Sequence, residues 1–137
     1  MIRQLTVFLE NRPGRLTALA AALGEAGVQM SALTVADTAE YGIVRIVCDK
    51  PDVAADALEA AGFTATIAEV TAVEVPHEPG GLARVLAVLD ETGADIAYSY
   101  CFANARGGAS VALKCDRQVE PALVGAGFTV ISQADLG

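Results

Sequence analysis

The sequence repeats itself at an interval of about 66 residues, and this repeat constrains the fold more than any other feature. The segment Asn11-Arg12-Pro13-Gly14-Arg15-Leu16 recurs as His77-Glu78-Pro79-Gly80-Gly81-Leu82. Behind each Pro-Gly pair, apolar residues keep the i, i+3, i+4, i+7 spacing of a helix with one buried face. These positions are Leu16, Leu19, Ala20 and Leu23 in the first copy, and Leu82, Val85, Leu86 and Leu89 in the second. Because the interval slips by one residue only in expected loops, we infer a duplicated unit.

Each copy has the pattern strand, helix, strand, strand, helix, strand. In the first copy we expect strands near 5–9, 28–36, 43–48 and 64–70, and helices near 14–26 and 52–61. In the second copy we expect strands near 71–75, 94–102, 109–115 and 128–133, and helices near 80–92 and 118–125. This order predicts an α+β fold of two tandem ferredoxin-like βαββαβ units, with antiparallel sheets and helices on one face. We expect the units at residues 1–68 and 69–137.

The composition argues against several classes of partner. The formal net charge is −8, and the few Lys and Arg residues are scattered, which opposes binding to nucleic acid or to an anionic membrane. The mean hydropathy is high at +0.44, yet no apolar run reaches the length of about 20 residues that a spanning helix needs. The first residues carry no signal-peptide pattern. We therefore expect a cytoplasmic protein without a membrane partner.

Residues for catalysis or metal binding are scarce. Cys48, Cys101 and Cys115 have no metal-ligand spacing, and His77 is the one histidine of the chain. Neither a nucleophile elbow nor a phosphate-binding P-loop is present. We expect no catalytic residue, no metal and no cofactor. A remote enzyme alternative is an acylphosphatase-like hydrolase, since those enzymes share the ferredoxin-like fold and use a loop arginine, a role that Arg12 or Arg15 would take.

The two Pro-Gly turns are the most informative candidate sites. Each opens onto a helix, so we expect outward-facing N–H groups at Gly14, Arg15 and Leu16, and at Gly80, Gly81 and Leu82. With the helix dipole behind them, such groups attract a carboxylate or a phosphate by about 0.3–1 kcal/mol. The alternative is that each Pro-Gly pair merely makes a turn. Solvated loop residues are likewise the alternative for Asn11, Arg12, Arg15, His77 and Glu78, and packing is the alternative for Tyr98 and Tyr100.

The motif around the first turn resembles an ACT domain, a module that binds amino acids in proteins of amino-acid metabolism. The resemblance rests on Asn11-Arg12-Pro13-Gly14-Arg15-Leu16 between a strand and an amphipathic helix, followed by Gly27-Val28-Gln29-Met30. It covers essentially the whole chain as two tandem ACT domains. The stretch from Val35 to Arg45 is similar to a narrower group, the stand-alone double-ACT proteins with no attached enzyme.

The resemblance implies a regulatory sensor of a free amino acid, without catalysis of its own, that forms a homodimer. The ligand would lie between a Pro-Gly loop and the second strand of a neighbouring unit. Many family members begin that strand with Asn, whereas this chain has Gln29 and Asp95. The implied ligand-binding residues are Asn11, Arg12, Pro13, Gly14, Arg15, Leu16, Gln29, Met30, Ser31, Leu33, His77, Glu78, Pro79, Gly80, Gly81, Leu82, Asp95, Ile96, Tyr98 and Tyr100. The main alternative is a dissociable regulatory subunit of an amino-acid biosynthetic enzyme.

Overall fold

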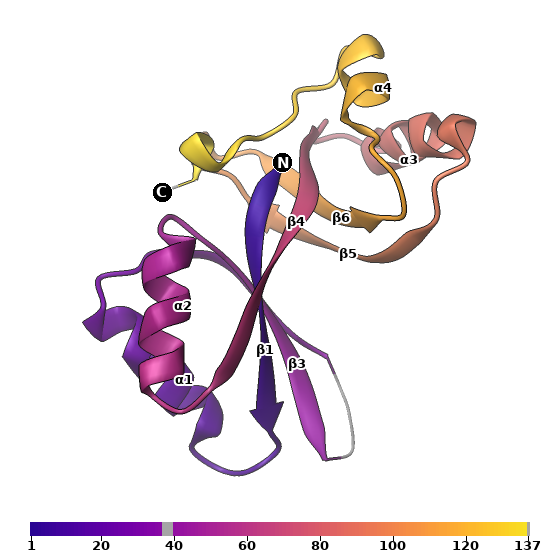
Figure 1. Ribbon diagram of the computed structural model, residues 1–137. Coiled ribbons are helices and arrows are strands. Elements are labelled where there is room, and N and C mark those ends of the chain that lie inside the picture. Colours follow the sequence, from indigo (N-terminus) through magenta and orange to yellow (C-terminus); the bar gives the residue numbers. More distant parts are fainter. Residues whose placement is uncertain (37–39, 137) are drawn as a thin grey trace. The chain divides into compact units, whose positions relative to one another are not determined.

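The computed structural model describes residues 1–36 and 40–136, and the chain divides into two compact units (Figure 1). The N-terminal unit contains residues 3–68, and the C-terminal unit contains residues 69–136 together with residues 1–2. Residues 37–39, which belong to the stretch that resembles stand-alone double-ACT proteins, lie outside the described residues.

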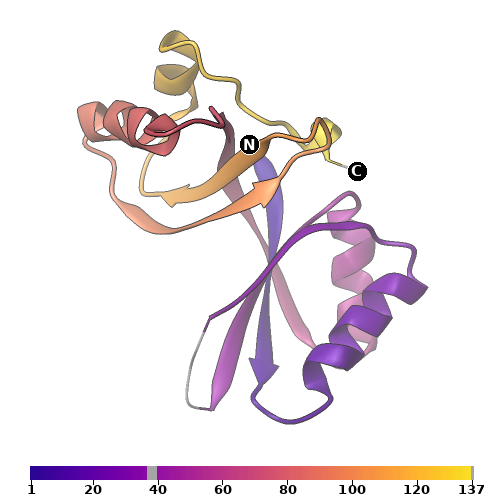
Figure 2. The ribbon, with the colours of Figure 1, turned by 180° about the vertical axis from the view of Figure 1, so that it is seen from behind.

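The N-terminal unit is a sheet covered by two helices. Its elements are β1 (Ile2–Glu10), α1 (Arg15–Glu25), β2 (Met30–Ala36), β3 (Tyr41–Cys48), α2 (Pro51–Ala60) and the first part of β4 (Thr64–Val75). The strand order is β2-β3-β1-β4, and β3 pairs antiparallel with both β1 and β2. The helices α1 and α2 lie side by side, as Figures 1 and 2 both show.

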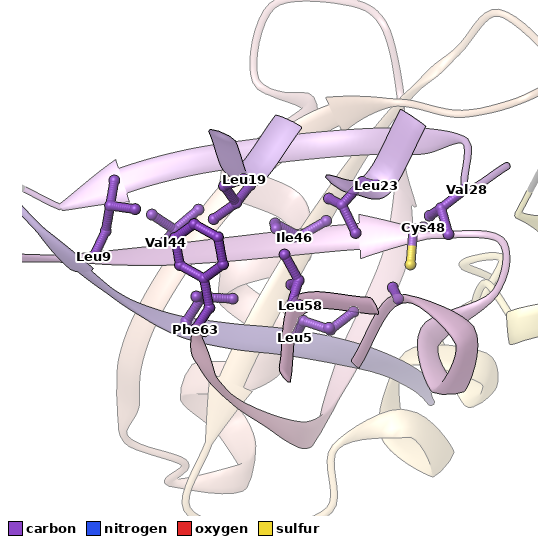
Figure 3. Packing of buried hydrophobic residues seen from close by; sticks show 12 residues of the cluster. Leu5, Leu9, Leu19, Leu23, Val28, Val44, Ile46, Cys48, Leu58 and Phe63 are labelled. Atoms are coloured by element: carbon purple, nitrogen blue, oxygen red, sulfur yellow. The ribbon is translucent and has the colours of Figure 1, made fainter. Parts of the chain in front are cut away.

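The core of this unit lies between the sheet and its helices. Leu19 and Leu23 of α1 and Leu58 of α2 are fully buried against alternate residues of β1 and β3, such as Leu5 and Ile46 (Figure 3). The period of two along a strand and the period of 3.6 along a helix place these residues on facing surfaces. The expected buried face of α1 is confirmed at Leu19 and Leu23, whereas Leu16 and Ala20, which were expected on it, are exposed.

The C-terminal unit repeats this arrangement. Its elements are the second part of β4, α3 (Gly81–Thr92), β5 (Ile96–Ala103), β6 (Ala109–Cys115), α4 (Glu120–Gly125) and a 3-10 turn at Gln133–Asp135. The strand order is β4-β6-β5, with antiparallel pairing throughout. Val85 and Leu89 of α3, with Leu123 of α4, pack on Val111 and Leu113 of β6. The α+β fold of βαββαβ type is therefore confirmed.

The ends of the two copies differ from the expectation. The strands expected near 64–70 and 71–75 are one continuous strand, β4, because no turn residue separates them. The strand expected near 128–133 is reduced to a single bridge between Val73 and Val130, flanked by two backbone hydrogen bonds. It ends where Ser132 caps the 3-10 turn through a reciprocal pair of hydrogen bonds with Asp135.

Candidate ligand pockets beside the two Pro-Gly loops

Both Pro-Gly loops enter their helices through a left-handed glycine. Gly14 precedes α1 with φ 87°, and Gly80 precedes α3 with φ 83°. This conformation costs residues with a side chain about 1–2 kcal/mol, which explains the glycine at both positions. The loops also share their hydrogen bonds. The N–H of Arg12 donates to the Glu10 carbonyl over 2.8 Å, and at the equivalent place the N–H of Glu78 donates to the Pro76 carbonyl over 2.8 Å.

The expected row of free N–H groups is interrupted at its middle position. The N–H of Arg15 donates to the carbonyl of Arg12 over 3.3 Å, and the N–H of Gly81 donates to the carbonyl of Glu78 over 3.0 Å. The expectation that these two amides are free is therefore wrong, because the tight loop uses them itself. Within the described residues, Gly14, Leu16 and their counterparts Gly80 and Leu82 have no acceptor for their amides.

A pocket of about 200 Å³ lies beside the first loop. It is formed where the end of β1, the loop, the start of α1 and the end of β2 meet. Glu10 and Arg12 form an ion pair at this pocket, in which the Arg12 side chain is exposed and the Glu10 side chain is half-buried. The residues that line it are Leu9, Glu10, Asn11, Arg12, Leu16, Val35, Ala36 and Gly42.

The equivalent region of the C-terminal unit holds two pockets that share His77. One, of about 610 Å³, lies along the second loop from Val75 to Ala83 and reaches Ala109. The other, of about 310 Å³, is lined by His77, Cys101, Phe102, Ala103, Gly107, Gly108 and Ala109. The repeat interval places Cys101 on Val35 and Ala109 on Gly42, so the same place in each unit is hollowed. The side chain of Glu78 is turned toward α3, where it pairs with Arg84.

The structure brings together only part of the expected set of ligand-binding residues. Asn11, Arg12 and Leu16 line the first pocket, and the segment 77–82 lines the second. Pro13, Gly14 and Arg15 are not among the lining residues of the first pocket. The guanidinium of Arg15 instead lies over the ring of Phe63, with Cζ at 4.4 Å from the ring centroid.

The expected strand residues do not line these pockets. The N–H of Gln29 donates to Asp49 Oδ1, and the N–H of Asp95 donates to Asp116 Oδ1, each over 2.9 Å. The backbone amides of both residues are therefore already hydrogen-bonded, just before the starts of β2 and β5. Met30 packs partly against the core, and the Tyr100 ring lies 6.5 Å from that of Phe102. The remaining members of this set are Ser31 and Leu33 on β2, and Ile96 and Tyr98 on β5.

Several lining residues were not expected from the sequence. They are Leu9, Glu10, Val35, Ala36 and Gly42 in the N-terminal unit, and Val75, Pro76, Ala83, Cys101, Phe102, Ala103, Gly107, Gly108 and Ala109 in the C-terminal unit. The ends of paired strands come close to the loop only in the folded sheet. Extending the sequence repeat to these strand ends aligns Val35 with Cys101 and Gly42 with Ala109, and this alignment is the signal that could have identified them.

The thiols differ in their surroundings. Burial raises the pKa of Cys48. Burial, and to a smaller extent the nearby Asp116 carboxylate, raises the pKa of Cys115, whereas Cys101 is exposed.

Among residues 1–36 and 40–136, no three His, Cys, Asp or Glu side chains gather as metal ligands would. None of the described helices is long and apolar enough to span a membrane.

Comparisons with known proteins identify the family and the fold. A family model described as the ACT domain pair matches residues 1–121. The crystal structure of protein BT0572 from Bacteroides thetaiotaomicron has a TM-score of 0.91 at 34% identity, over 98% of this chain and 94% of that chain.

More distant structures share the fold. The ligand-free regulatory subunit of aspartate kinase from Thermus thermophilus has a TM-score of 0.66 at 17% identity, over 90% of this chain and 89% of that chain. The regulatory subunit from Thermus flavus has a TM-score of 0.62 at 17% identity, over 89% and 88%. No curated protein matches the chain. The match of the family model over most of the sequence shows that this chain belongs to the ACT domain pair family.

Proposed function

We propose that the protein is a regulatory module that binds a free amino acid and has no catalysis of its own. The observation that carries the proposal is the recurrence of one hollow at matching positions of the two units. Each hollow adjoins a helix that starts at a left-handed glycine, Gly14 or Gly80. Membership of the ACT domain pair family supports this proposal.

The ligand carboxylate would bind at the helix starts. In the N-terminal unit the amide of Leu16 and the guanidinium of Arg12, two residues that line the pocket, would supply donors and positive charge, and the amide of Gly14 lies in the adjoining loop. In the C-terminal unit the amides of Gly80 and Leu82 would do the same. Occupation of either pocket would change how units or chains pack, and that change would be the regulatory output.

Further parts of the proposal concern organisation. We propose ACT domains at residues 1–68 and 69–137, a homodimer, and a cytoplasmic location. In the homodimer, a second copy would supply strand residues to the ligand. These residues are Gln29, Met30, Ser31 and Leu33 of the first domain, and Asp95, Ile96, Tyr98 and Tyr100 of the second.

A screen of the twenty amino acids tests the proposal. Thermal unfolding of the full chain with each amino acid, followed by isothermal titration calorimetry of those that stabilise it, measures binding directly. A ligand at one hundred times its Kd stabilises the folded state by about 2.7 kcal/mol. We expect stabilisation by at least one amino acid, and the absence of any stabilisation would refute the proposal.

A second candidate function is that of a dissociable regulatory subunit of an amino-acid metabolic enzyme. It is favoured by the similarity in fold to proteins described as regulatory subunits of aspartate kinase. It predicts a stable complex that co-purifies with such an enzyme. The acylphosphatase-like alternative ranks last, because the guanidinium of Arg15 lies over Phe63 and Arg15 is not among the lining residues of the pocket. It would require acyl-phosphate turnover that Arg12→Ala abolishes.

A further inference from the structure

The two hollows differ in the charges that surround them. Glu10 and Arg12 both line the pocket of the N-terminal unit and form an ion pair there. At the equivalent positions the C-terminal unit has Pro76 and Glu78, and Glu78 is paired with Arg84. Of the described residues that line the hollows of the two units, those of the first include both a carboxylate and a guanidinium, whereas Arg84 does not line the second. This combination is complementary to the ammonium and carboxylate of a free amino acid.

Most of the described residues that line the first pocket are apolar. Leu9, Leu16, Val35 and Ala36 line it together with Gly42, and Asn11 adds a polar amide. Among the described lining residues, Glu10 and Arg12 are the charged ones. A charged ligand side chain placed against these apolar residues would lose part of its hydration without gaining a partner among them. The volume of about 200 Å³ is suited to a small organic group, since an apolar cavity of about 150 Å³ already holds benzene.

Gly42 keeps part of this space open. A Cβ placed on Gly42 would lie 3.4 Å from Cγ1 of Val35 and 3.5 Å from the carbonyl oxygen of Ala36, which are ordinary contacts. Gly42 is not among the residues with positive φ, so its backbone does not require glycine. The C-terminal unit has Ala109 at this position, and Ala109 lines both of its pockets.

We infer that the pocket of the N-terminal unit selects a free amino acid with a branched aliphatic side chain, and that Gly42 determines the size it accepts. The ligand class comprises valine, leucine and isoleucine. This inference rests on the proposed function and specifies the ligand of one of its two sites. The rim pair Glu10 and Arg12 would bind the charged groups of the ligand, while Leu9, Leu16 and Val35 would contact its side chain.

Calorimetric titration of the full chain tests the selectivity. L-valine, L-leucine and L-isoleucine are compared with L-aspartate and L-lysine. We expect the best aliphatic ligand to bind at least about tenfold more tightly than either charged amino acid, since an unpaired charge against apolar residues is costly. Tighter or equal binding of a charged amino acid would overturn the inference.

A glycine-to-alanine pair tests the role of Gly42. Gly42→Ala adds a methyl group at the pocket wall, and we expect leucine or isoleucine to bind about tenfold more weakly, with a smaller loss for valine. The matched control is Gly24→Ala, on a part of α1 where an added Cβ meets no atom within 4 Å. We expect this control to bind leucine as the wild type does. Unchanged affinity in Gly42→Ala would overturn the inference.

A second variant covers the case in which Gly42→Ala does not fold, as judged by its thermal unfolding. The side chain of Val35 is 48% exposed, so Val35→Ala removes a wall of the pocket at little cost to the core. We expect weaker binding of all three aliphatic amino acids, and unchanged affinity would again overturn the inference.

The screen of twenty amino acids distinguishes failure of the proposed function from failure of this inference. If none binds, the proposed function fails, and if a polar one binds best, only this inference fails.

Discussion

Gly81 is the point at which one added methyl group should damage the C-terminal unit most. A Cβ on Gly81 would lie 2.1 Å from the carbonyl oxygen of Pro76 and 3.0 Å from its carbonyl carbon. Both atoms belong to the backbone, so no side-chain rotation relieves the clash. The equivalent residue of the first loop, Arg15, carries a side chain. The second loop therefore closes more tightly around its helix start than the first.

The cost of Gly81→Ala follows from what must move. Separating the added Cβ from Pro76 requires a shift of the loop or of the first turn of α3, and overpacking of this kind costs about 1–3 kcal/mol. The shift also disturbs the hydrogen bond from the Gly81 N–H to the Glu78 carbonyl, which is worth about 0.5–1.5 kcal/mol. We expect a total loss of about 2–4 kcal/mol in the free energy of unfolding of the C-terminal unit.

Urea denaturation followed by circular dichroism measures this loss, and amide hydrogen exchange assigns it to α3. The matched control is Gly125→Ala in α4 of the same unit, where an added Cβ meets nothing within 4 Å. Helix propensity predicts a gain of up to about 1 kcal/mol for this control. A Gly81→Ala variant that stays within about 0.5 kcal/mol of the wild type, the range of ordinary surface substitutions, would refute the geometric argument.

Three further predictions concern binding, pH dependence and thiol reactivity. Gly14→Asp should weaken amino-acid binding in calorimetry while the protein stays folded, because the added carboxylate repels the ligand carboxylate; full affinity would place the ligand elsewhere. Arg3 donates two hydrogen bonds to Asp52, of 2.7 and 2.8 Å, and this lowers the pKa of Asp52. The pair therefore stabilises the fold above the unfolded aspartate pKa of about 3.9, and its contribution is lost as pH falls through the lower folded pKa. Asp52→Asn should flatten this acid dependence in unfolding curves, and curves parallel to the wild type would argue against the pair. Iodoacetamide at neutral pH should modify the exposed Cys101 before Cys48, whose pKa burial raises; equal rates in peptide mass spectrometry would contradict this order.

The periodicity of the sequence was sufficient to predict the repeated architecture. Leu19 and Leu23 fall on one helical face, and Leu5, Val7 and Ile46 fall on one strand face, because these periods of 3.6 and 2 are properties of the local backbone. The duplication strengthened each assignment, since equivalent positions in the second copy repeat the pattern.

The sequence also identified the two Pro-Gly loops as candidate sites. Left-handed glycines at Gly14 and Gly80 are local requirements of a tight turn before a helix, so they are readable from residue type alone. The hydrogen bonding of the loop amides could not be predicted from the sequence. Whether the N–H groups of Arg15 and Gly81 are used within the loop depends on the final path of the backbone.

Tertiary structure alone decided the shape and chemistry of the pockets. Glu10, Leu16, Val35 and Gly42 are separated along the chain and come together only when the ends of β1, β2 and β3 align beside α1. A pocket wall is formed by residues that are distant in the sequence. The space left by the absent side chain of Gly42 can be recognised only once the fold places Val35 beside it. The sequence by itself therefore determined the duplicated fold and the position of its loops, while packing between distant segments decided which residues form each pocket.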